Sequence, residues 1–575
     1  MKIKLSIIFF LIGYLLPITN LYTQETPIAP LPDLIHGIIS EEEIRVFGDT
    51  TNSRATSFTI PPLPPVRNIA EFEPMEAVLI AYPNDFGVPF SLIVELSRDI
   101  TVTTLVLNQG GENNVRNMYE TNNVNLANCT FVQTPLNSYW TRDCGPWFIA
   151  DSTDRIAIID FFYSSSRPFD NAIPQKMSEV LGLDSYYMDI TIQGGNYMTD
   201  GLGISVSTDR VFDENPSLSL QDVQQIASDY LGVHSYSIID DPNNTYIKHV
   251  DCWGKFLAVD KVLIKQVPQS DSQYNDIEDV ADYFYNAISS YGTPYRVYRI
   301  YTPDNEPYTN SLIVNNKVFV PAAGTSWDDA AVNTFQQAMP GYQIFSITSN
   351  NNRWLSTDAL HCRTKGIPDR NMIYIKHIPI SGIVDEAVDY EIEADIISYS
   401  GDPIYSDSVN IYFSEDDGAF ESILMSLQSE NTYMGLIPGN SGATEIAYYL
   451  SVTNLEGKEY NNPFIGASDP FRYTINTPEV TPEVTPEPTP EVTTEPTPEV
   501  TAEPTPEQTP ELATGDVDGD GAVNILDAML TARYYVELPI AVFYPEVADV
   551  NYDGFINIID ALLIARHYVG LITLE

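Results

Sequence analysis

The sequence has few cysteines and few basic residues. Four cysteines in 575 residues are too few for a framework of disulfide bonds, so packing must stabilise the chain. Only 28 lysines and arginines stand against 79 aspartates and glutamates, which gives a formal net charge of −51. Nucleic acids and anionic membranes attract clustered positive charge, so we expect neither as a partner. A cationic substrate, calcium ions or a merely solvated acidic surface would each fit this balance.

Long apolar runs are also missing. Beyond about Leu16, no stretch reaches the ~18 apolar residues of a membrane-spanning helix, so we expect no integral membrane segment. At the start of the chain, Lys2 and Lys4 precede an apolar run that ends near Leu16. This pattern is typical of a secretory signal peptide, with an uncleaved anchor as the alternative. We therefore predict a signal peptide over 1–23, an N-terminal extension over 24–64, and a secreted, extracellular protein.

The length favours three or four domains at roughly 150 residues each, and 43% apolar residues can form packed cores. A change in composition marks one boundary. Residues 477–512 form nine tetrapeptides, each beginning with Thr and each containing Glu. Because this segment has little to bury and its charges repel, we predict a disordered, extended Thr/Pro/Glu linker. A ligand for a proline-binding module is the weaker alternative.

One motif occurs twice after the linker, within residues 513–575, and the two copies begin 33 residues apart. Positions 1, 3, 5, 9 and 12 of each copy carry side-chain oxygen donors, and position 6 is glycine. These donors are Asp516, Asp518, Asp520, Asn524 and Asp527 in the first copy, and Asp549, Asn551, Asp553, Asn557 and Asp560 in the second. Oxygen ligands at this spacing suit a hard cation such as Ca²⁺. Apolar helices are expected directly after the loops, at 528–536 and 561–569.

These residues resemble a dockerin, whose paired calcium loops and helices dock onto a cohesin domain. Position 12 is Asp rather than the Glu of an ordinary EF-hand loop. The resemblance implies two Ca²⁺ ions, a small α-helical fold, and a cohesin-bearing scaffold protein as partner. It also implies a location outside the cell, in an assembly or attached to a surface.

Residues 376–476 show apolar residues at every second position. The alternation is clean over 390–396 and looser over 409–413 and 446–452, with turn residues between these segments. We predict an immunoglobulin-like β-sandwich without chemistry of its own.

Chemistry is expected in residues 65–375, where short apolar strands alternate with amphipathic segments. Five related polar phrases recur there at intervals of roughly 50 to 60 residues, beginning at Trp140, Gly194, His249, Thr309 and Leu360. Such recurrence predicts an α/β repeat whose strand ends converge on a central axis. Convergence of this kind could form a site for a small, highly charged group.

The phrases resemble those of the guanidine-modifying enzymes, and especially the secreted bacterial peptidylarginine deiminases. The most specific are Trp140-Thr-Arg-Asp-Cys-Gly-Pro-Trp147, His249-Val-Asp251 and Ala359-Leu-His-Cys-Arg-Thr364. The resemblance implies an α/β fold of five blades, called the pentein propeller. Agmatine deiminases are related members of the same group of enzymes. Family members usually end in a different sorting module. The difference concerns where the protein is located and not the reaction that it would catalyse.

The resemblance implies a catalytic set that also makes chemical sense. Cys362 would attack the guanidinium carbon and form a thiouronium intermediate. His249 would protonate the departing ammonia and then activate water. Asp143 and Asp251 would hold the guanidinium by charge-assisted hydrogen bonds, and Asn310 would steady the thiol or the adduct. No cofactor is expected for catalysis.

Substrate contacts follow from the same resemblance. The related deiminases bind the α-carboxylate of a C-terminal arginine with two arginines, but here only Arg167 is present and Ser165 takes the other place. Trp140, Tyr246 and Ile247 match positions that line the substrate. We expect activity on peptide or protein arginine, preferably C-terminal.

Two other functions remain open. One is a deiminase of agmatine or another small guanidine; Arg167 argues against it, because agmatine has no carboxylate. The other is a non-catalytic scaffold component that binds arginine. Cys144 and Cys252 each follow a proposed guanidinium-binding Asp, and we expect them to pack on the far side of strands, with a disulfide as the alternative. His361 would face away from the site if it lay on a strand beside Cys362.

Overall fold

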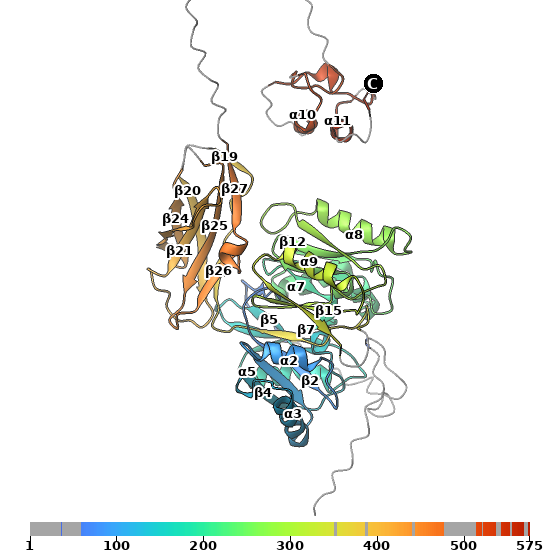
Figure 1. Cartoon of the computed structure of the whole chain (residues 1–575), viewed down its shortest axis with the longest axis vertical. Helices are drawn as coiled ribbons and strands as arrows, with labels where there is room; N and C mark the ends of the chain where they lie inside the picture. Colours follow the sequence, from blue (N-terminus) through green and yellow to red (C-terminus); the bar gives the residue numbers. More distant parts are fainter. Residues whose placement is uncertain are drawn as a thin grey trace, which may run out of the picture. The chain divides into compact units, whose positions relative to one another are not determined.

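The computed structural model describes residue 36 and residues 59–349, 354–385, 389–439, 443–476, 513–519, 521–535, 542–552, 555–568 and 573–574. It divides into two compact units, Met1–Val480 and Thr481–Glu575, which we describe separately (Figure 1). The predicted signal peptide and the predicted linker over 477–512 lie outside the described residues. Within the described part of the chain, no helix is long and apolar enough to cross a membrane.

Between Arg67 and Pro368 lies a mixed α/β fold made of five small sheets, which confirms the predicted α/β class. In every sheet a central strand pairs antiparallel with one neighbour and parallel with another. A helix connects the two parallel strands, as a parallel pair requires a crossover. The strand orders are β17-β2-β3-β4, β1-β5-β6-β7, β10-β9-β8, β11-β12-β13 and β14-β15-β16.

The strands of these sheets are β1 (Arg67–Asn68), β2 (Met75–Tyr82), β3 (Thr101–Val106), β4 (Cys129–Gln133), β5 (Trp147–Ala150), β6 (Ile156–Phe162), β7 (Ser185–Thr191), β8 (Met198–Thr199), β9 (Ile204–Thr208), β10 (Ser235–Ile239), β11 (Gly254–Ala258), β12 (Lys261–Gln266), β13 (Arg296–Tyr301), β14 (Leu312–Val314), β15 (Lys317–Ala322), β16 (Gln343–Thr348) and β17 (Lys365–Pro368). The crossover helices are α2 (Phe90–Leu96), α5 (Ile173–Leu181), α7 (Leu220–Leu231), α8 (Tyr274–Asn286) and α9 (Asp328–Ala338). Further helical segments are α3 (Gln109–Thr121), η1 (Leu126–Asn128), α4 (Thr141–Cys144), η2 (Asp170–Ala172), η3 (Gly194–Asn196), α6 (Arg210–Glu214) and η4 (Val250–Cys252).

Helix α7 illustrates how the sequence sets these crossovers. Ser219 and Asp222 form a reciprocal capping box at its start. Its buried residues recur at helical spacing and face the sheet: Val223, Ala227, Tyr230 and Leu231. The helix ends at Gly232, whose φ is +67°. A Cβ there would lie 1.8 Å from a backbone carbonyl oxygen, that of Val66, so only glycine fits.

The five polar phrases occupy one equivalent place in the repeat. Each lies directly before the first strand of an antiparallel pair: α4 before β5, η3 before β8, η4 before β11, Asn310 before β14 and Cys362 before β17. The fold therefore presents five turns in equivalent positions, one from each sheet.

Residues 373–476 form two sheets that share a core, with orders β18-β20-β24-β23 and β19-β27-β25-β21-β22, where β26 also pairs with β25. Buried Ile392 and Ile396 of one sheet belong to the same core as Ile411 and Leu450 of the other. The predicted alternation over 390–396 is confirmed by the alternating burial along β20. A β-sandwich is thus present, while its immunoglobulin-like type stays a prediction.

The elements of the sandwich are β18 (Ile373–Lys376), β19 (Ile383–Asp385), β20 (Tyr390–Ser398), β21 (Val409–Glu415), β22 (Glu421–Leu424), β23 (Ser426–Ser429), β24 (Thr432–Ile437), β25 (Glu445–Thr453), β26 (Glu459–Asn462), η5 (Gly466–Ser468) and β27 (Phe471–Asn476).

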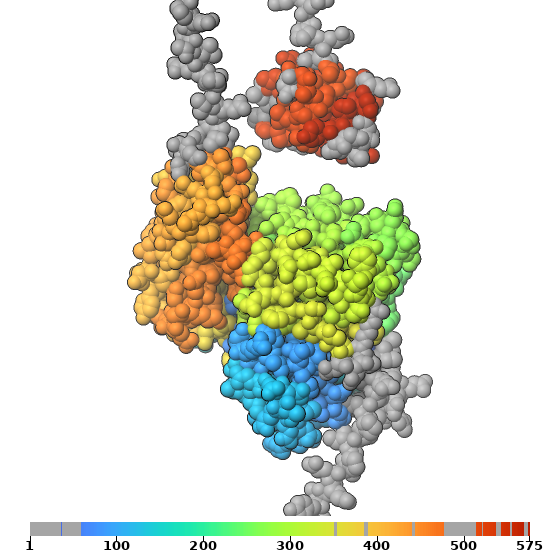
Figure 2. Space-filling model, viewed as in Figure 1, coloured from blue at the N-terminus to red at the C-terminus, as the bar shows by residue number. Residues whose placement is uncertain are grey.

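Charged contacts join the sandwich to the α/β fold. Buried Lys261 of β12 pairs with Asp469, and Asp369 accepts a hydrogen bond from the Tyr460 hydroxyl at 2.8 Å. Figure 2 shows the sandwich, in orange, packed against the yellow and green residues of the α/β fold.

The second unit contains α10 (Ile525–Tyr535), η6 (Pro545–Val547) and α11 (Ile558–Tyr568). A small core includes Val517, Ala548 and Ile564. Both helices begin three residues before the predicted starts at 528 and 561. The prediction was wrong because the position-12 aspartates lie inside the first helical turn, where their carboxylates accept loop backbone N–H groups.

Candidate active site

The five turns bring a thiol, two imidazoles, two carboxylates and an amide together in a buried cluster. Cys362, His249, Asp143 and Asn310 have no exposed surface, and Asp251 is 3% exposed. All five predicted catalytic residues therefore lie in one place, although they come from turns up to 219 residues apart along the chain.

Asn310 makes hydrogen bonds with the turn that carries Cys362 and with the thiol itself. Its Oδ1 accepts hydrogen bonds from the backbone N–H groups of His361 (3.0 Å) and Cys362 (3.3 Å). Because the oxygen is held in this way, Nδ2 is turned toward Cys362 Sγ, at 3.1 Å. The amide can therefore donate to the sulfur and would stabilise a thiolate.

Asp251 also contacts the sulfur, with Oδ2 3.6 Å from Cys362 Sγ. The same oxygen accepts a hydrogen bond from His361 Nδ1 at 2.7 Å, and His361 Nε2 contacts Glu71 Oε2 at 2.5 Å. Burial would raise the pKa of Asp251, but its hydrogen bond and charge interaction with His361 hold this pKa below its ordinary value. Asp251 thus remains an anion that can bind a cation.

Glu71 anchors this chain of contacts. It also pairs with Arg142 at 2.8 Å and Lys255 at 2.9 Å. Although burial works in the other direction, Arg142, His361 and Lys255 hold the pKa of Glu71 well below its usual range. The network fixes His361, and His361 in turn fixes the Asp251 carboxylate.

Asp143 and His249 face each other across Gly195. Asp143 Oδ1 accepts a hydrogen bond from the Gly195 backbone N–H at 3.0 Å and lies 3.8 Å from His249 Nδ1. A Cβ on Gly195 would lie 2.6 Å from His249 Nδ1 and 2.8 Å from Asp143 Oδ1. No larger residue fits here without displacing both side chains.

Gln193 sets the tautomer of His249. Its Nε2 donates to Glu214 at 2.7 Å, so its Oε1 must accept from His249 Nε2, at 3.0 Å. His249 Nδ1 then carries a lone pair and has no hydrogen-bond partner among the described residues. Burial, helped by the positive charge of Arg210, holds the pKa of His249 well below its ordinary value. The imidazole is therefore neutral, and Nδ1 is the ring atom that is able to accept a proton.

The thiol is protonated in the same state. Burial raises the pKa of Cys362 well above its usual range, and the negative charges of Asp251, Asp358 and Asp143 raise it further. A cation bound between these carboxylates would reverse that effect and favour the thiolate.

The predicted substrate residues lie at or near this cluster. Arg167 is buried rather than on the surface; its guanidinium stacks on Trp140, 4.6 Å from the ring, and its Nη1 donates to the Tyr163 hydroxyl at 3.0 Å. Ile247 is fully buried, whereas Tyr246 is 50% exposed and contacts Thr357 at 3.4 Å. Tyr246 therefore lies at the protein surface, while Ile247 beside it is part of the interior.

Two local expectations were wrong because the recurring phrases lie in turns rather than on strands. His249 lies at the start of η4 and Asp251 within it, and this tight turn brings both side chains to the site. Cys144 and Cys252 lie on α4 and η4 instead of strands, although both are buried and free. His361 lies in a turn, so it does not face away from the site but contacts Asp251.

Sequence reasoning also missed Glu71, Gln193, Gly195 and His36. Glu71 and His361 are 290 positions apart, so no local spacing links them. Gly194-Gly-Asn196 was recognised as one of the five phrases, and that phrase could have suggested Gly195. His36 Nε2 contacts Asp143 Oδ2 inside the cluster, and no motif marks this histidine.

In the carboxy-terminal unit, side-chain oxygen atoms of predicted calcium ligands lie close together. Carboxylate oxygens of Asp516, Asp518 and Asp527 lie within 4.8 Å of one another, a donor set that fits Ca²⁺. Asp560 of the second loop accepts the same pattern of backbone N–H groups as Asp527 of the first. The remaining predicted ligands in described positions are Asn524, Asp549, Asn551 and Asn557. Asp520 and Asp553 lie outside the described residues.

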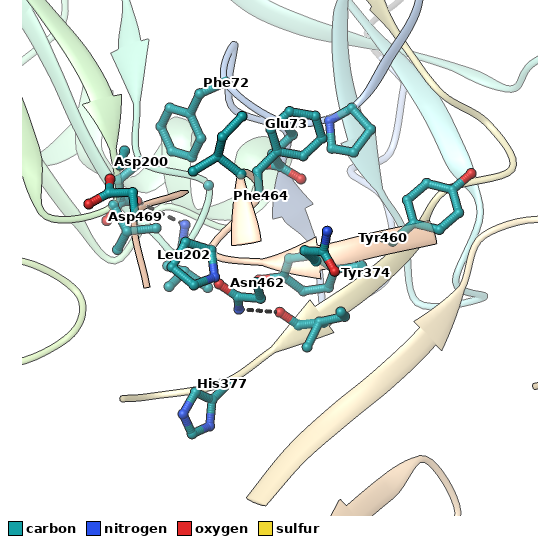
Figure 3. A pocket seen from close by; sticks show the side chains of 18 of the residues that line it. Phe72, Glu73, Asp200, Leu202, Tyr374, His377, Tyr460, Asn462, Phe464 and Asp469 are labelled. Atoms are coloured by element: carbon teal, nitrogen blue, oxygen red, sulfur yellow. Dashed lines mark hydrogen bonds between the residues drawn. The ribbon is translucent and has the colours of Figure 1, made fainter. Parts of the chain in front are cut away.

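A separate cavity of about 110 Å³ lies between the α/β fold and the sandwich (Figure 3). Its lining includes Phe72, Asp200, Tyr374, Phe464 and Asp469 but none of the predicted catalytic residues. Asp469 is paired with Lys261. We interpret this cavity as a gap in the packing between the two parts rather than as the site of the chemistry.

Comparisons with known proteins point to the same region. The family described as Porphyromonas-type peptidyl-arginine deiminase matches residues 67–368, and the dockerin type I domain matches residues 514–567. A predicted agmatine deiminase from Legionella pneumophila is 25% identical over 293 residues, which cover 46% of this chain and 81% of that protein.

Solved structures similar to this chain include the agmatine deiminase of Enterococcus faecalis. Its sequence is 22% identical and the TM-score is 0.48; the match covers 53% of this chain and 96% of that chain. A predicted arginine deiminase from Porphyromonas gingivalis is 20% identical with a TM-score of 0.46, over 53% and 98% of the two chains.

Proposed function

Because this chain belongs to the Porphyromonas-type peptidyl-arginine deiminase family, we propose that it hydrolyses the guanidinium of peptide or protein arginine to citrulline and ammonia. The observation that carries the proposal is the buried contact of the Cys362 thiol with Asn310 and Asp251. The family and this cluster make the chain a deiminase of the guanidine-modifying type, and the peptide substrate is our inference. We also propose that the five sheets form the blades of a pentein propeller around this cluster.

The first half of the reaction forms the carbon–sulfur bond. The guanidinium enters between Asp143 and Asp251, and its positive charge lowers the pKa of the thiol. The thiol proton passes to His249 Nδ1, and the sulfur lone pair attacks the guanidinium carbon. The tetrahedral adduct collapses as His249 returns the proton to one NH₂ group, which leaves as ammonia.

The second half breaks the same bond. The remaining S-alkylthiouronium is attacked by water, which gives its proton to His249 Nδ1. The new adduct collapses with cleavage of the carbon–sulfur bond: the sulfur leaves and takes up the hydroxyl proton of the adduct, which leaves the neutral ureido group of citrulline. Asn310 Nδ2 stabilises the sulfur whenever it is anionic. His249 then gives its proton to solvent or to the released ammonia, which restores the neutral imidazole and the free thiol.

Arg167 supports a preference for C-terminal arginine. A buried guanidinium stacked on Trp140, beside the catalytic cluster, could pair with the α-carboxylate of the substrate. With Ser165 in place of a second arginine, we expect a preference rather than strict selection.

We expect Arg167→Ala to raise the KM for a peptide ending in arginine by roughly 10- to 100-fold, since a charge-assisted hydrogen bond contributes about 1.5–3 kcal/mol. The KM for the same arginine inside a longer peptide should change little. Citrulline release from both peptides measures this directly. Arg116→Ala is the matched control, because Arg116 also stacks on an aromatic ring, 4.2 Å from Phe131, but is half exposed. Equal losses on both peptides would contradict a role for Arg167 as carboxylate clamp.

Agmatine is the second candidate substrate, because the Legionella relative is named for it. The test of the proposed function is citrulline or carbamoylputrescine release from three substrates: agmatine, a peptide ending in arginine, and a peptide with internal arginine. Turnover of either peptide supports the proposal, and turnover of agmatine alone replaces it. No turnover of any of the three would favour a non-catalytic arginine-binding protein.

The dockerin type I domain implies work in an extracellular or cell-surface assembly. We propose that the protein is secreted and attached to a cohesin-bearing scaffold, and that each repeat holds one Ca²⁺. The loop aspartates would hold these ions, and the ions would keep the two helices in place for docking.

Removing one calcium site should be measurable without any activity assay. We expect calorimetric titration to give two Ca²⁺ per chain for the wild type and one for Asp527→Ala, because Asp527 is buried within the first loop. Glu546→Ala, a change of an exposed acid on η6, should still take two. Deiminase activity should be unchanged in both variants. Equal uptake by Asp527→Ala and the wild type would contradict the assigned site.

A further inference from the structure

His36 lies inside the candidate active site, although it comes from the predicted N-terminal extension. Its side chain is only 1% exposed. Nε2 contacts Asp143 Oδ2, and Nδ1 lies 2.6 Å from the Thr357 carbonyl oxygen. The ring stacks on Trp140, with centroids 4.8 Å apart, and meets the His249 ring edge-on at 5.4 Å. His36 therefore contacts the residues that are proposed to receive the substrate.

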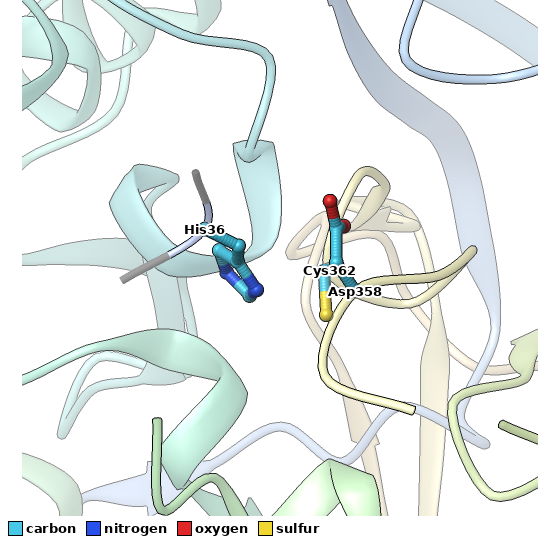
Figure 4. Close-up of side chains that lie close together, drawn as sticks. All are labelled: His36, Asp358 and Cys362. Carbon is cyan, nitrogen blue, oxygen red and sulfur yellow. The ribbon is translucent and has the colours of Figure 1, made fainter. Parts of the chain in front are cut away.

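The ring also approaches the nucleophile. Ligand atoms of His36, Asp358 and Cys362 lie within 4.8 Å of one another, and Figure 4 shows the imidazole beside the other two side chains. A guanidinium carbon within reach of Cys362 Sγ would have to occupy this same space. A substrate guanidinium and the His36 imidazole therefore cannot occupy the cluster at the same time.

The hydrogen bonds indicate the protonation state of His36. The Thr357 carbonyl and an ionised Asp143 carboxylate can only accept, so both ring nitrogens must donate. Burial lowers the pKa of His36, but Asp143, its hydrogen bond and Asp358 outweigh burial and raise this pKa above its ordinary value. The bound form is a planar cation with N–H donors in its plane. It shares these features with a guanidinium.

We propose that His36 is an intramolecular competitor of the arginine substrate, which holds the enzyme in a low-affinity state while its imidazolium is seated on Asp143. This inference rests on the proposed function, because it assigns His36 to the guanidinium subsite. The chain exists as two populations, with His36 seated or displaced, and substrate binds only the second. The apparent affinity for substrate equals the intrinsic affinity multiplied by the fraction of chains in which His36 is displaced.

The competition should weaken as pH rises. A group whose pKa is raised in the seated state stabilises that state fully below its ordinary pKa and loses this effect as pH rises through the raised pKa. The groups facing the ring are Asp143 and Asp358, which favour the cation, and His249 and Cys362, which are neutral in the resting state. The titration of Cys362 and His249 also affects turnover, so only a ratio between variants isolates His36.

The test compares the full chain with its His36→Ala variant, with His234→Ala as the control for an exposed histidine. We expect His36→Ala to lower the KM for an arginine peptide by tenfold or more, corresponding to roughly 90% of chains with His36 seated. The kcat should change by less than about threefold, because His36 has no part in the chemistry. The ratio of kcat/KM between variant and wild type should be larger at about pH 6 than at about pH 9.

A second readout does not depend on turnover. Chloroacetamidine, a small cationic amidine that alkylates thiols, should modify Cys362 at least tenfold faster in His36→Ala than in the wild type, as followed by peptide mass mapping. Faster alkylation without citrulline formation would support the competitor and overturn the proposed deiminase activity. Unchanged KM and an unchanged alkylation rate would overturn the competitor. A difference between variants that disappears in EDTA would also overturn it, because inhibition would then require a metal held by His36 and Cys362.

Discussion

Replacing Cys362 with alanine is expected to lower citrulline release by roughly 10⁴-fold or more, because covalent attack has no substitute in the pocket. The other groups cannot take over this role. His249 is needed as the proton carrier, and Asp143 and Asp251 are needed as anions for the guanidinium. Binding should survive, so the KM or Kd for an arginine peptide should change by only a few-fold. Initial rates and equilibrium binding of the same peptide measure both effects.

The alanine variant must be compared with a change of another thiol. Cys129→Ala removes a partly exposed cysteine outside the cluster and should keep full activity. In Cys362→Ala the Asn310 amide loses its sulfur partner, which costs about 1–3 kcal/mol of stability. A folded variant by circular dichroism that retains more than about 1% of the activity would contradict nucleophilic catalysis by Cys362.

Replacing His249 with glutamine is expected to lower kcat by roughly 10³-fold, within the range of 10²–10⁴ for loss of a general acid–base group. Glutamine can keep a hydrogen bond to Gln193, but it cannot accept the thiol proton or deliver it to ammonia. Both halves of the reaction need that proton, so neither ammonia release nor citrulline release should proceed at a normal rate. Separate quantification of ammonia and citrulline in a single turnover tests this.

His234→Gln is the matched control, because His234 is exposed and its Nε2 donates to the Leu202 carbonyl oxygen, at 3.2 Å. It should behave like the wild type. If His249→Gln retained near-normal kcat, another base would have to serve the thiol, and the tautomer assigned through Gln193 would lose its functional meaning.

The sequence predicted the fold class because its signals are local. Alternating burial along β20 follows directly from the period-two pattern of residues 390–396. The α/β class of residues 67–368 follows from short apolar strands that alternate with amphipathic helices such as α7. The predicted helix starts in the second unit were three residues too late. In each repeat a buried Asp lies in the first helical turn, where Asp is uncommon, and its carboxylate accepts hydrogen bonds from backbone N–H groups of the preceding loop.

The candidate catalytic residues could be found because each lies in a recognisable phrase. Their supporting partners could not. His361 was expected to face away from Cys362, since neighbours on a strand alternate, but the chain turns there and places both side chains toward Asp251. His36 contacts Thr357 across 321 positions, and only the three-dimensional fold shows that the two meet.

Trapping the covalent intermediate tests nucleophilic attack by Cys362 most directly. An arginine peptide in excess would be mixed with the full chain, quenched in acid within the first turnovers, and analysed by intact-mass and peptide mass spectrometry. We expect an adduct whose added mass equals the substrate peptide less one ammonia, located on the enzyme fragment that contains Cys362 and absent from Cys362→Ala. Active enzyme that forms citrulline without any adduct on Cys362, under conditions that trap other thiouronium species, would contradict attack by this thiol.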